Sequence, residues 1–156
     1  MGKALVRDLA LTEKLQLTGA TAPSLFRAAW SFAEAVILAT RPQEIRLLES
    51  AAKAFWNTCI PLSQMSVTRK LLAEPLEIVT RACAARGFPE ELLGQLFNLT
   101  FDCMREDGKL DRGLELTEEA LKVLPKSFHT EIWRAKAVLL SGSANVSLES
   151  LGVQDK

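Results

Sequence analysis

Tyrosine is absent from this sequence of 156 residues, and so are runs in which Val, Ile or Thr alternate with polar residues. A half-buried β-strand needs such alternation. Apolar residues recur instead at helical spacing, between Pro and Gly residues that interrupt helices. The sequence therefore predicts an all-α protein, and its 48% hydrophobic content suffices for one domain with a sizeable core.

An excess of charge of either sign is also missing. Nineteen Lys and Arg residues balance nineteen Asp and Glu residues, and no run of five or six like charges occurs. A nucleic-acid-binding protein normally carries a concentrated basic region. We therefore expect no nucleic acid among the partners of this chain.

Long apolar segments are missing as well. No run approaches the roughly 18 residues needed to cross a membrane, and the start, MGKALVRDLALTEK, lacks the apolar core of a signal peptide. The cysteines Cys59, Cys83 and Cys103 lie far apart without a C-x-x-C pair, which favours buried thiols in a reducing compartment over disulfides. We expect a protein of the cytoplasm without membrane contact.

Residues suited to catalysis or metal binding are few. His129 is the only histidine, with no Cys or acidic residue at metal-ligand spacing, so we expect no metal site and no cofactor. An enzyme using a Cys–His nucleophilic pair would need His129 to fold back onto a cysteine. Cys59 and Cys83 each continue an apolar helical stripe, which favours core positions. We therefore expect no catalytic residues, and an enzyme is the least favoured alternative.

The first helices are predicted from apolar stripes and from proline. A weak helix covers residues 4–17, and a second begins at Ser24 and ends before Pro42, since a residue preceding proline avoids helical angles. A third runs from Pro42 to Pro61 and packs antiparallel on the second. Their stripes are Leu25, Ala29, Phe32 and Val36, widened by Phe26, Trp30 and Ile37, and then Ile45, Leu48, Ala52, Phe55 and Cys59.

The next helix runs from Ser66, its expected N-cap, to Arg86. Pro75 lies inside it, so we expect a kink or a break into two shorter helices there. Gly87 provides the C-terminal stop, and Pro89 belongs to the first turn of the following helix. The apolar face consists of Leu72, Leu76, Val79 and Cys83.

Two further helices follow, separated by a glycine. The first covers residues 90–106 and the second ends at Pro125, with Gly108 at the turn between them and Asp111 as the expected N-cap. The first has the apolar face Leu93, Phe97, Phe101 and Met104, and the second has Leu114, Thr117, Leu121 and Leu124. Gly113 and Ala120 are small residues at which a neighbouring backbone could come close.

The register of these two helices resembles the tetratricopeptide repeat, which has a period of about 34 residues. That family places small, aromatic, small and Pro residues at spacings of four, three and five, and Gly113, Thr117, Ala120 and Pro125 occupy those places. Thr117 replaces the usual aromatic residue, and Phe101 stands where a small residue is normal. The resemblance implies antiparallel helical hairpins stacked as a short α-solenoid, in a domain spanning residues 1–140 with its clearest repeat at 90–125.

A last helix is predicted from Ile132 to Leu140, where Trp133 and Ala137 match the Trp and the small residue of a first repeat helix. Residues 141–156 are small and polar, so we expect a disordered tail there. A repeat buries its apolar face only against its neighbours. The last helix therefore indicates a short isoform or a fragment of a longer array, with Trp133 and Leu140 as candidate contacts for missing repeats or another protein.

The segment AAKAFWNTCIPLSQMSVTRKLLAEPLEIVTRA, residues 51–82, resembles the large cilia- and flagella-associated proteins of the axonemal central apparatus. The resemblance implies a structural part of motile cilia, located in the axoneme and its cytoskeleton, with other central-apparatus subunits as partners. The alternative is a free-standing cytosolic adaptor that binds a peptide or partner helix in a groove lined by first helices. Basic residues such as Arg105 invite that interpretation, but interspersed acidic residues favour a solvated surface.

Overall fold

The computed structural model describes residues 21–39 and 44–150, with side chains as far as Ala144. All regular structure within them is helical, which confirms the all-α prediction, while the helix predicted at 4–17 lies outside the described residues. The helices are α2 (Ala22–Leu38), α3 (Ile45–Leu62), α4 (Ser66–Ala85), α5 (Glu90–Glu106), α6 (Leu110–Val123) and α7 (Lys126–Ser150).

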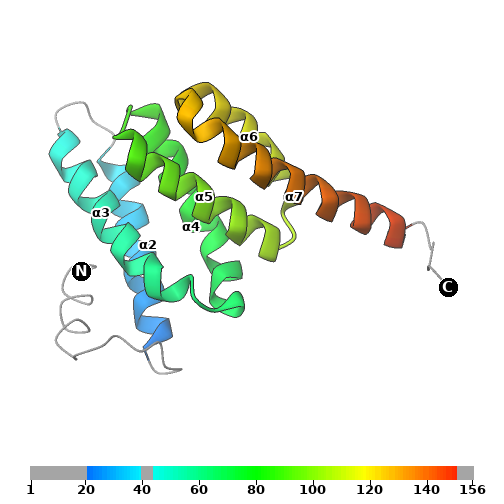
Figure 1. Cartoon of the computed structure of the whole chain (residues 1–156). Coiled ribbons are helices and arrows are strands. Elements are labelled where there is room, and N and C mark those ends of the chain that lie inside the picture. Colours follow the sequence, from blue (N-terminus) through cyan, green and yellow to red (C-terminus); the bar gives the residue numbers. More distant parts are fainter. Residues whose placement is uncertain (1–20, 40–43, 151–156) are drawn as a thin grey trace.

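Helices that follow one another pack as antiparallel hairpins arranged side by side (Figure 1). The most extensive packing joins α2 to α3, α4 to α5, and α6 to α7. The predicted antiparallel pairing of α2 with α3 is therefore confirmed. Helix α5 also packs on α6, as a hairpin over residues 90–125 requires, but less extensively than on α4. Further packing of α2 on α4 and of α5 on α7 connects the hairpins into one stack.

The predicted apolar stripes form most of the core. The four stripe residues of α2, from Leu25 to Val36, are buried, as are the four of α4 and the four of α5. Ile45 is an exception, because it lies in the first turn of α3 and is 48% exposed. Ile37, one of the residues that widen the predicted stripe of α2, is 46% exposed, so the wider stripe is not buried at the end of that helix.

Two expected caps are wrong. Met65, in extended conformation, holds the N-cap position of α4, and Ser66 is the first helical residue. Its hydroxyl donates instead to Glu106 of α5, 2.8 Å away. Asp111 lies in the first turn of α6, where a carboxylate favours the positive helix end, and Lys109 holds the N-cap position.

The proline and glycine residues take positions in the helices that differ in part from those predicted. Helix α4 continues through Pro75, which is buried, so of the expected kink or break into two helices the break is wrong. Proline removes one backbone hydrogen bond, and the residues buried on either side of it keep the helix in place. Pro61 lies in the last turn of α3, one residue before its end, and Pro89 is the N-cap of α5 rather than part of its first turn. Gly87 and Gly108 have φ of 65° and 73°, the left-handed conformation that glycine tolerates best at helix ends.

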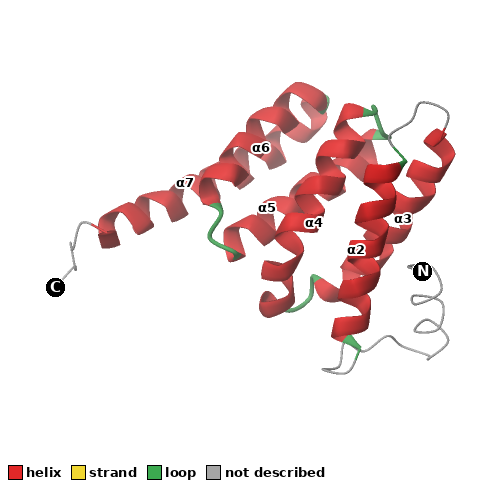
Figure 2. Cartoon of the chain, turned by 180° about the vertical axis from the view of Figure 1, so that it is seen from behind, coloured by secondary structure: helices red, strands yellow, loops and turns green. Residues whose placement is uncertain are grey.

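Helix α7 is much longer than the predicted segment from Ile132 to Leu140. It starts at Lys126 and continues to Ser150, so residues 141–150 are helical rather than a disordered tail, and residues 151–156 lie outside the description. A Cβ placed at Gly142 would lie 3.4 Å from the Leu110 side chain, so α6 is in contact with α7 beyond Leu140. Adding residues to an existing helix costs little. Figure 2 shows the end of α7 projecting past the other helices.

Candidate functional site

Helix α7 closes the stack on α6, and this packing depends on a small residue. A Cβ placed at Gly113 would lie 3.2 Å from both terminal carbons of Leu139. Gly113 and Ala120 are buried, which fits their predicted place at a close helix contact. Leu116 is fully buried as well, although the sequence analysis did not assign it to the apolar face of α6. It lies three residues after Gly113, at helical spacing, and that spacing could have identified it.

The flank of α7 that points away from the stack carries large apolar residues. Trp133 is 53% exposed and Leu140 is 50% exposed. Ala137 between them is exposed too, and the spacings of four and three place all three on one side of the helix. We call Trp133, Ala137 and Leu140 the outer stripe. Ala137, which matches the small residue of a first repeat helix, is not covered by another helix within the described residues.

Lys136 connects Trp133, a member of the outer stripe, to α6. Lys136 forms an ion pair with Glu118 of α6, and its ammonium group lies 4.8 Å from the centroid of the Trp133 ring. The hydrogen bond from Lys136 lowers the pKa of Glu118, as does the positive charge of Lys136. A cation above an aromatic ring is attracted to its negative face. The Trp133 ring is therefore held on one side, while much of its surface stays open to solvent.

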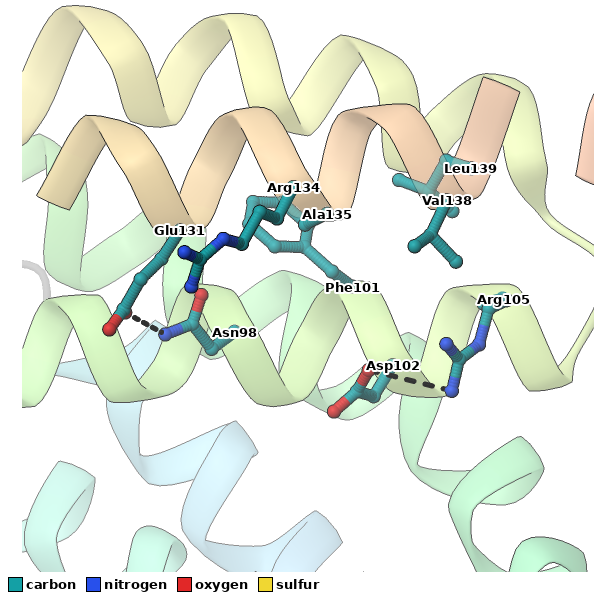
Figure 3. A pocket seen from close by; sticks show the side chains of 9 residues that line it. All are labelled: Asn98, Phe101, Asp102, Arg105, Glu131, Arg134, Ala135, Val138 and Leu139. Carbon is teal, nitrogen blue, oxygen red and sulfur yellow. Dashed lines mark hydrogen bonds and ion pairs between the residues drawn. The ribbon is translucent and has the colours of Figure 1, made fainter. Parts of the chain in front are cut away.

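The other flank of α7 forms a groove with α5, shown in Figure 3. Its volume is about 370 Å³, within the range of roughly 300–1,000 Å³ typical of binding sites. Helix α5 contributes Asn98, Phe101, Asp102 and Arg105, and α7 contributes Glu131, Arg134, Ala135, Val138 and Leu139. Phe101 and Leu139 are buried at 2% and 1% exposure, whereas Val138 is 44% exposed. The groove therefore combines apolar surface with charges of both signs.

The polar side chains of the groove differ in how well they are paired. Asn98 donates to Glu131 across the two helices at 3.1 Å, which ties up that carboxylate. Arg105 and Asp102, both on α5, are 3.7 Å apart, a distance typical of a weak pair. The guanidinium of Arg134 has no hydrogen bond or ion pair within the described part of the chain. Figure 3 marks the contact of Asn98 with Glu131 and that of Asp102 with Arg105 by dashed lines.

A cluster of charges joins α4 to α6. Glu77 is only 3% exposed, and its Oε2 lies 2.6 Å from Arg112 Nη2 of α6. Its Oε1 lies 3.3 Å from Arg81 Nη2, which is equally close to Glu119 of α6. This cluster was not predicted from the sequence, although the spacing of four between Glu77 and Arg81 is typical of a helical ion pair. Its role is to connect two hairpins.

The residues with catalytic potential are engaged in packing. His129, in the first turn of α7, donates from Nε2 to the carbonyl oxygen of Leu124 at the end of α6, 3.0 Å away. Burial raises the pKa of Cys83 and of Cys103 to about 12, and it raises the pKa of Cys59 well above its usual value. The reactive thiolate form is therefore scarce at neutral pH. Among the described residues, no cluster of His, Cys, Asp or Glu could hold a metal ion.

The remaining residues of the predicted repeat occupy structural positions. Phe97 and Phe101 are buried with their ring centroids 6.0 Å apart. Thr117, which stands in place of an aromatic residue, is buried, and its hydroxyl donates to the Leu114 carbonyl at 2.7 Å. Pro125 separates α6 from α7. Within residues 21–39 and 44–150, no helix is long and apolar enough to cross a membrane.

Comparisons of the chain with protein-family models, with curated proteins and with solved structures gave no match.

Proposed function

We propose that this chain is a protein-interaction scaffold without enzymatic activity, built from stacked helical hairpins of the tetratricopeptide-repeat type. The observation that carries the proposal is the outer stripe. Trp133 and Leu140, each about half exposed, lie on the last helix of the stack, where a further hairpin or another protein could cover them. Solvent exposure of large apolar side chains in a row is typical of a contact surface. Tryptophan is also among the residues that most often dominate binding energy.

We further propose that the scaffold belongs to the central apparatus of motile cilia, bound to other subunits of the axoneme. The support for this part is the resemblance of residues 51–82 to the large cilia- and flagella-associated proteins. This segment covers the last two thirds of α3, the following turn and most of α4. A structural role of this kind requires no active site, in agreement with cysteines that are buried and protonated.

A second candidate is a free-standing cytosolic adaptor that binds a peptide or a partner helix. The observation that favours it is the groove between α5 and α7, whose size suits side chains of a ligand. The outer stripe and the groove lie on different flanks of α7, so substitutions can separate the two candidates.

The test is affinity capture of axonemal proteins on the purified chain, with extract from ciliated cells. We compare the wild type with the double variant Trp133→Ala, Leu140→Ala. The matched control is Val67→Ala, Leu71→Ala on α4, where the two apolar side chains are 69% and 54% exposed. All proteins are checked by circular dichroism for equal helix content.

The proposal expects central-apparatus proteins to be captured by the wild type and by the control, and capture by the α7 variant to fall by about tenfold or more. Equal capture by both double variants would mean that the outer stripe is not the contact surface. A monomeric wild-type chain that captures no axonemal protein would refute the ciliary scaffold.

A further inference from the structure

We propose that the outer stripe of α7 binds the outer stripe of a second copy of this chain, so that two α7 helices pack antiparallel in a symmetric dimer. The proposal rests on the proposed function, since it takes the outer stripe as a contact surface and names one partner for it. Two-fold dimers are the commonest assemblies of identical chains, and in them the same patch of both copies must fit itself. The outer stripe meets this condition in one register.

The exposed apolar side chains of α7 follow the spacing of a seam between two helices. After Trp133, Ala137 and Leu140, the next position on the same face is Ala144, and all four residues are exposed. The spacings of four, three and four are those of the a and d positions at which two helices pack along their length. The four residues extend over about 16 Å of helix, because the rise is about 1.5 Å per residue.

Large and small residues alternate along this seam in an order that fits its own reversal. In an antiparallel pair centred between residues 138 and 139, Trp133 lies opposite Ala144 of the second copy, and Leu140 lies opposite Ala137. Each large side chain then meets a small one, so the helix axes can come within the usual distance of about 8–10 Å. A parallel pair would place Trp133 against Trp133 and Ala137 against Ala137, which produces a steric conflict at one level and a gap at the other. The pattern therefore selects the antiparallel arrangement.

The charges beside the seam permit this register. Arg134 and Lys136 border the seam on its two sides, and in the antiparallel pair they come next to Ser141 and Ser143 of the second copy. Like charges are therefore not brought face to face. Lys136 is also neutralised by Glu118 of its own chain, with which it forms an ion pair.

The position of α7 in the stack leaves room for a second helix. The outer stripe points away from the stack, and the end of α7 projects past the other helices (Figure 2). In the antiparallel pair each projecting end lies beside α7 of the second copy, where Trp133 covers Ala144. A single helix pair buries less than the roughly 1,200–2,000 Å² of standard interfaces, so we expect a reversible dimer with a Kd on the order of micromolar.

The test is sedimentation velocity of the purified full chain over a series of concentrations. The decisive variants exchange a large and a small residue. Ala144→Trp places a tryptophan opposite Trp133 of the second copy, whereas Trp133→Ala combined with Ala144→Trp again sets a large residue against a small one. The matched control is Val67→Ala, Leu71→Ala, which removes exposed apolar side chains from α4. Circular dichroism verifies that all variants have equal helix content.

The proposal expects the wild type and the control to dimerise equally. Ala144→Trp should raise the Kd of the dimer about tenfold or more, because two large side chains collide. The double variant should return the Kd to within about threefold of the wild-type value. The proposal is overturned if the wild type is monomeric at every concentration, if Ala144→Trp dimerises as well as the wild type, or if the double variant does not restore the dimer.

Failure of the dimer can be distinguished from failure of the scaffold. A monomeric chain that captures central-apparatus proteins through Trp133 and Leu140 would refute the dimer alone. A dimer that responds to the variants as expected but captures no axonemal protein would refute the ciliary scaffold and support the pairing of α7 with itself.

Discussion

Replacing Gly94 with alanine should loosen the contact between α5 and α7. Gly94 is buried in α5, and the Phe128 ring of α7 lies directly against its backbone. A Cβ at this position would lie 2.6 Å from Cε1 and 2.9 Å from Cδ1 of that ring. Carbon atoms in favourable contact are about 3.5–4.0 Å apart. The substitution therefore requires the ring, or the whole of α7, to move by about 1 Å.

Two contributions of opposite sign determine how Gly94→Ala changes the free energy of unfolding. Alanine favours a helix over glycine by about 0.8–1.0 kcal/mol. Forcing an extra methyl group into a packed contact costs typically about 1–3 kcal/mol. Because the close atoms belong to a rigid aromatic ring and not to the tip of a flexible chain, we expect the steric cost to exceed the gain in helix propensity. The net loss in the free energy of unfolding should be about 1–2 kcal/mol.

The assay is urea unfolding of the full chain, followed by circular dichroism. Gly142→Ala is the matched control, since a Cβ at Gly142 would lie 3.4 Å from Leu110, an ordinary contact. The control should be neutral or stabilising by up to about 1 kcal/mol. Combining Gly94→Ala with Phe128→Ala should remove the steric part of the loss. If Gly94→Ala stabilised the chain as much as the control does, the close packing of α7 on α5 would be refuted.

Three further predictions concern charges and thiols. Glu77→Gln should lower the free energy of unfolding, measured in urea, by about 1–2 kcal/mol, because it removes both ion pairs of a buried carboxylate whose partners are half exposed. Unchanged stability would mean that the charge cluster does not hold α4 to α6. The hydrogen bond from Ser66 is the main cause that lowers the pKa of Glu106 from 4.5, and the nearby positive charges lower it further. Above pH 4.5 the ionised carboxylate therefore stabilises the fold. This stabilisation is lost as the pH falls through the lower pKa of the folded state. The stability difference between wild type and Ser66→Ala should thus be present at neutral pH and vanish in acid, and a difference independent of pH would contradict it. Cys83 and Cys103, with pKa values raised by burial to about 12, should react with a thiol reagent only as fast as the protein unfolds; rapid labelling of either thiol in the native protein would show that it is not buried.

Much of the fold follows from local rules that are visible in the sequence. Apolar residues at helical spacing identified the buried faces of α2, α4 and α5, since a helix in a stack must bury one stripe. Gly87 and Gly108 marked helix ends because few other residues adopt a positive φ without strain. Trp133 and Leu140 were predicted as candidate contacts, and both are exposed.

The features that the sequence did not reveal depend on contacts between distant residues. Ser66 was expected to cap α4, but Glu106 of α5 competes for its hydroxyl. The pairing of Glu77 with Arg112 requires α4 and α6 to be neighbours. The groove forms from residues on α5 and α7 whose nearness depends on the Gly94 contact. Helix α7 continues beyond Leu140 because α6 contacts it at Gly142. The composition of residues 141–150 does not reveal that contact.

The most direct test of the scaffold proposal is the location of the chain in multiciliated cells. Tagged wild type, the variant Trp133→Ala, Leu140→Ala, and the control Val67→Ala, Leu71→Ala are expressed and imaged against a marker of the central microtubule pair. The account predicts that wild type and control label the central pair along the cilium and that the α7 variant does not. A diffuse cytosolic signal from the folded wild-type chain would contradict the account.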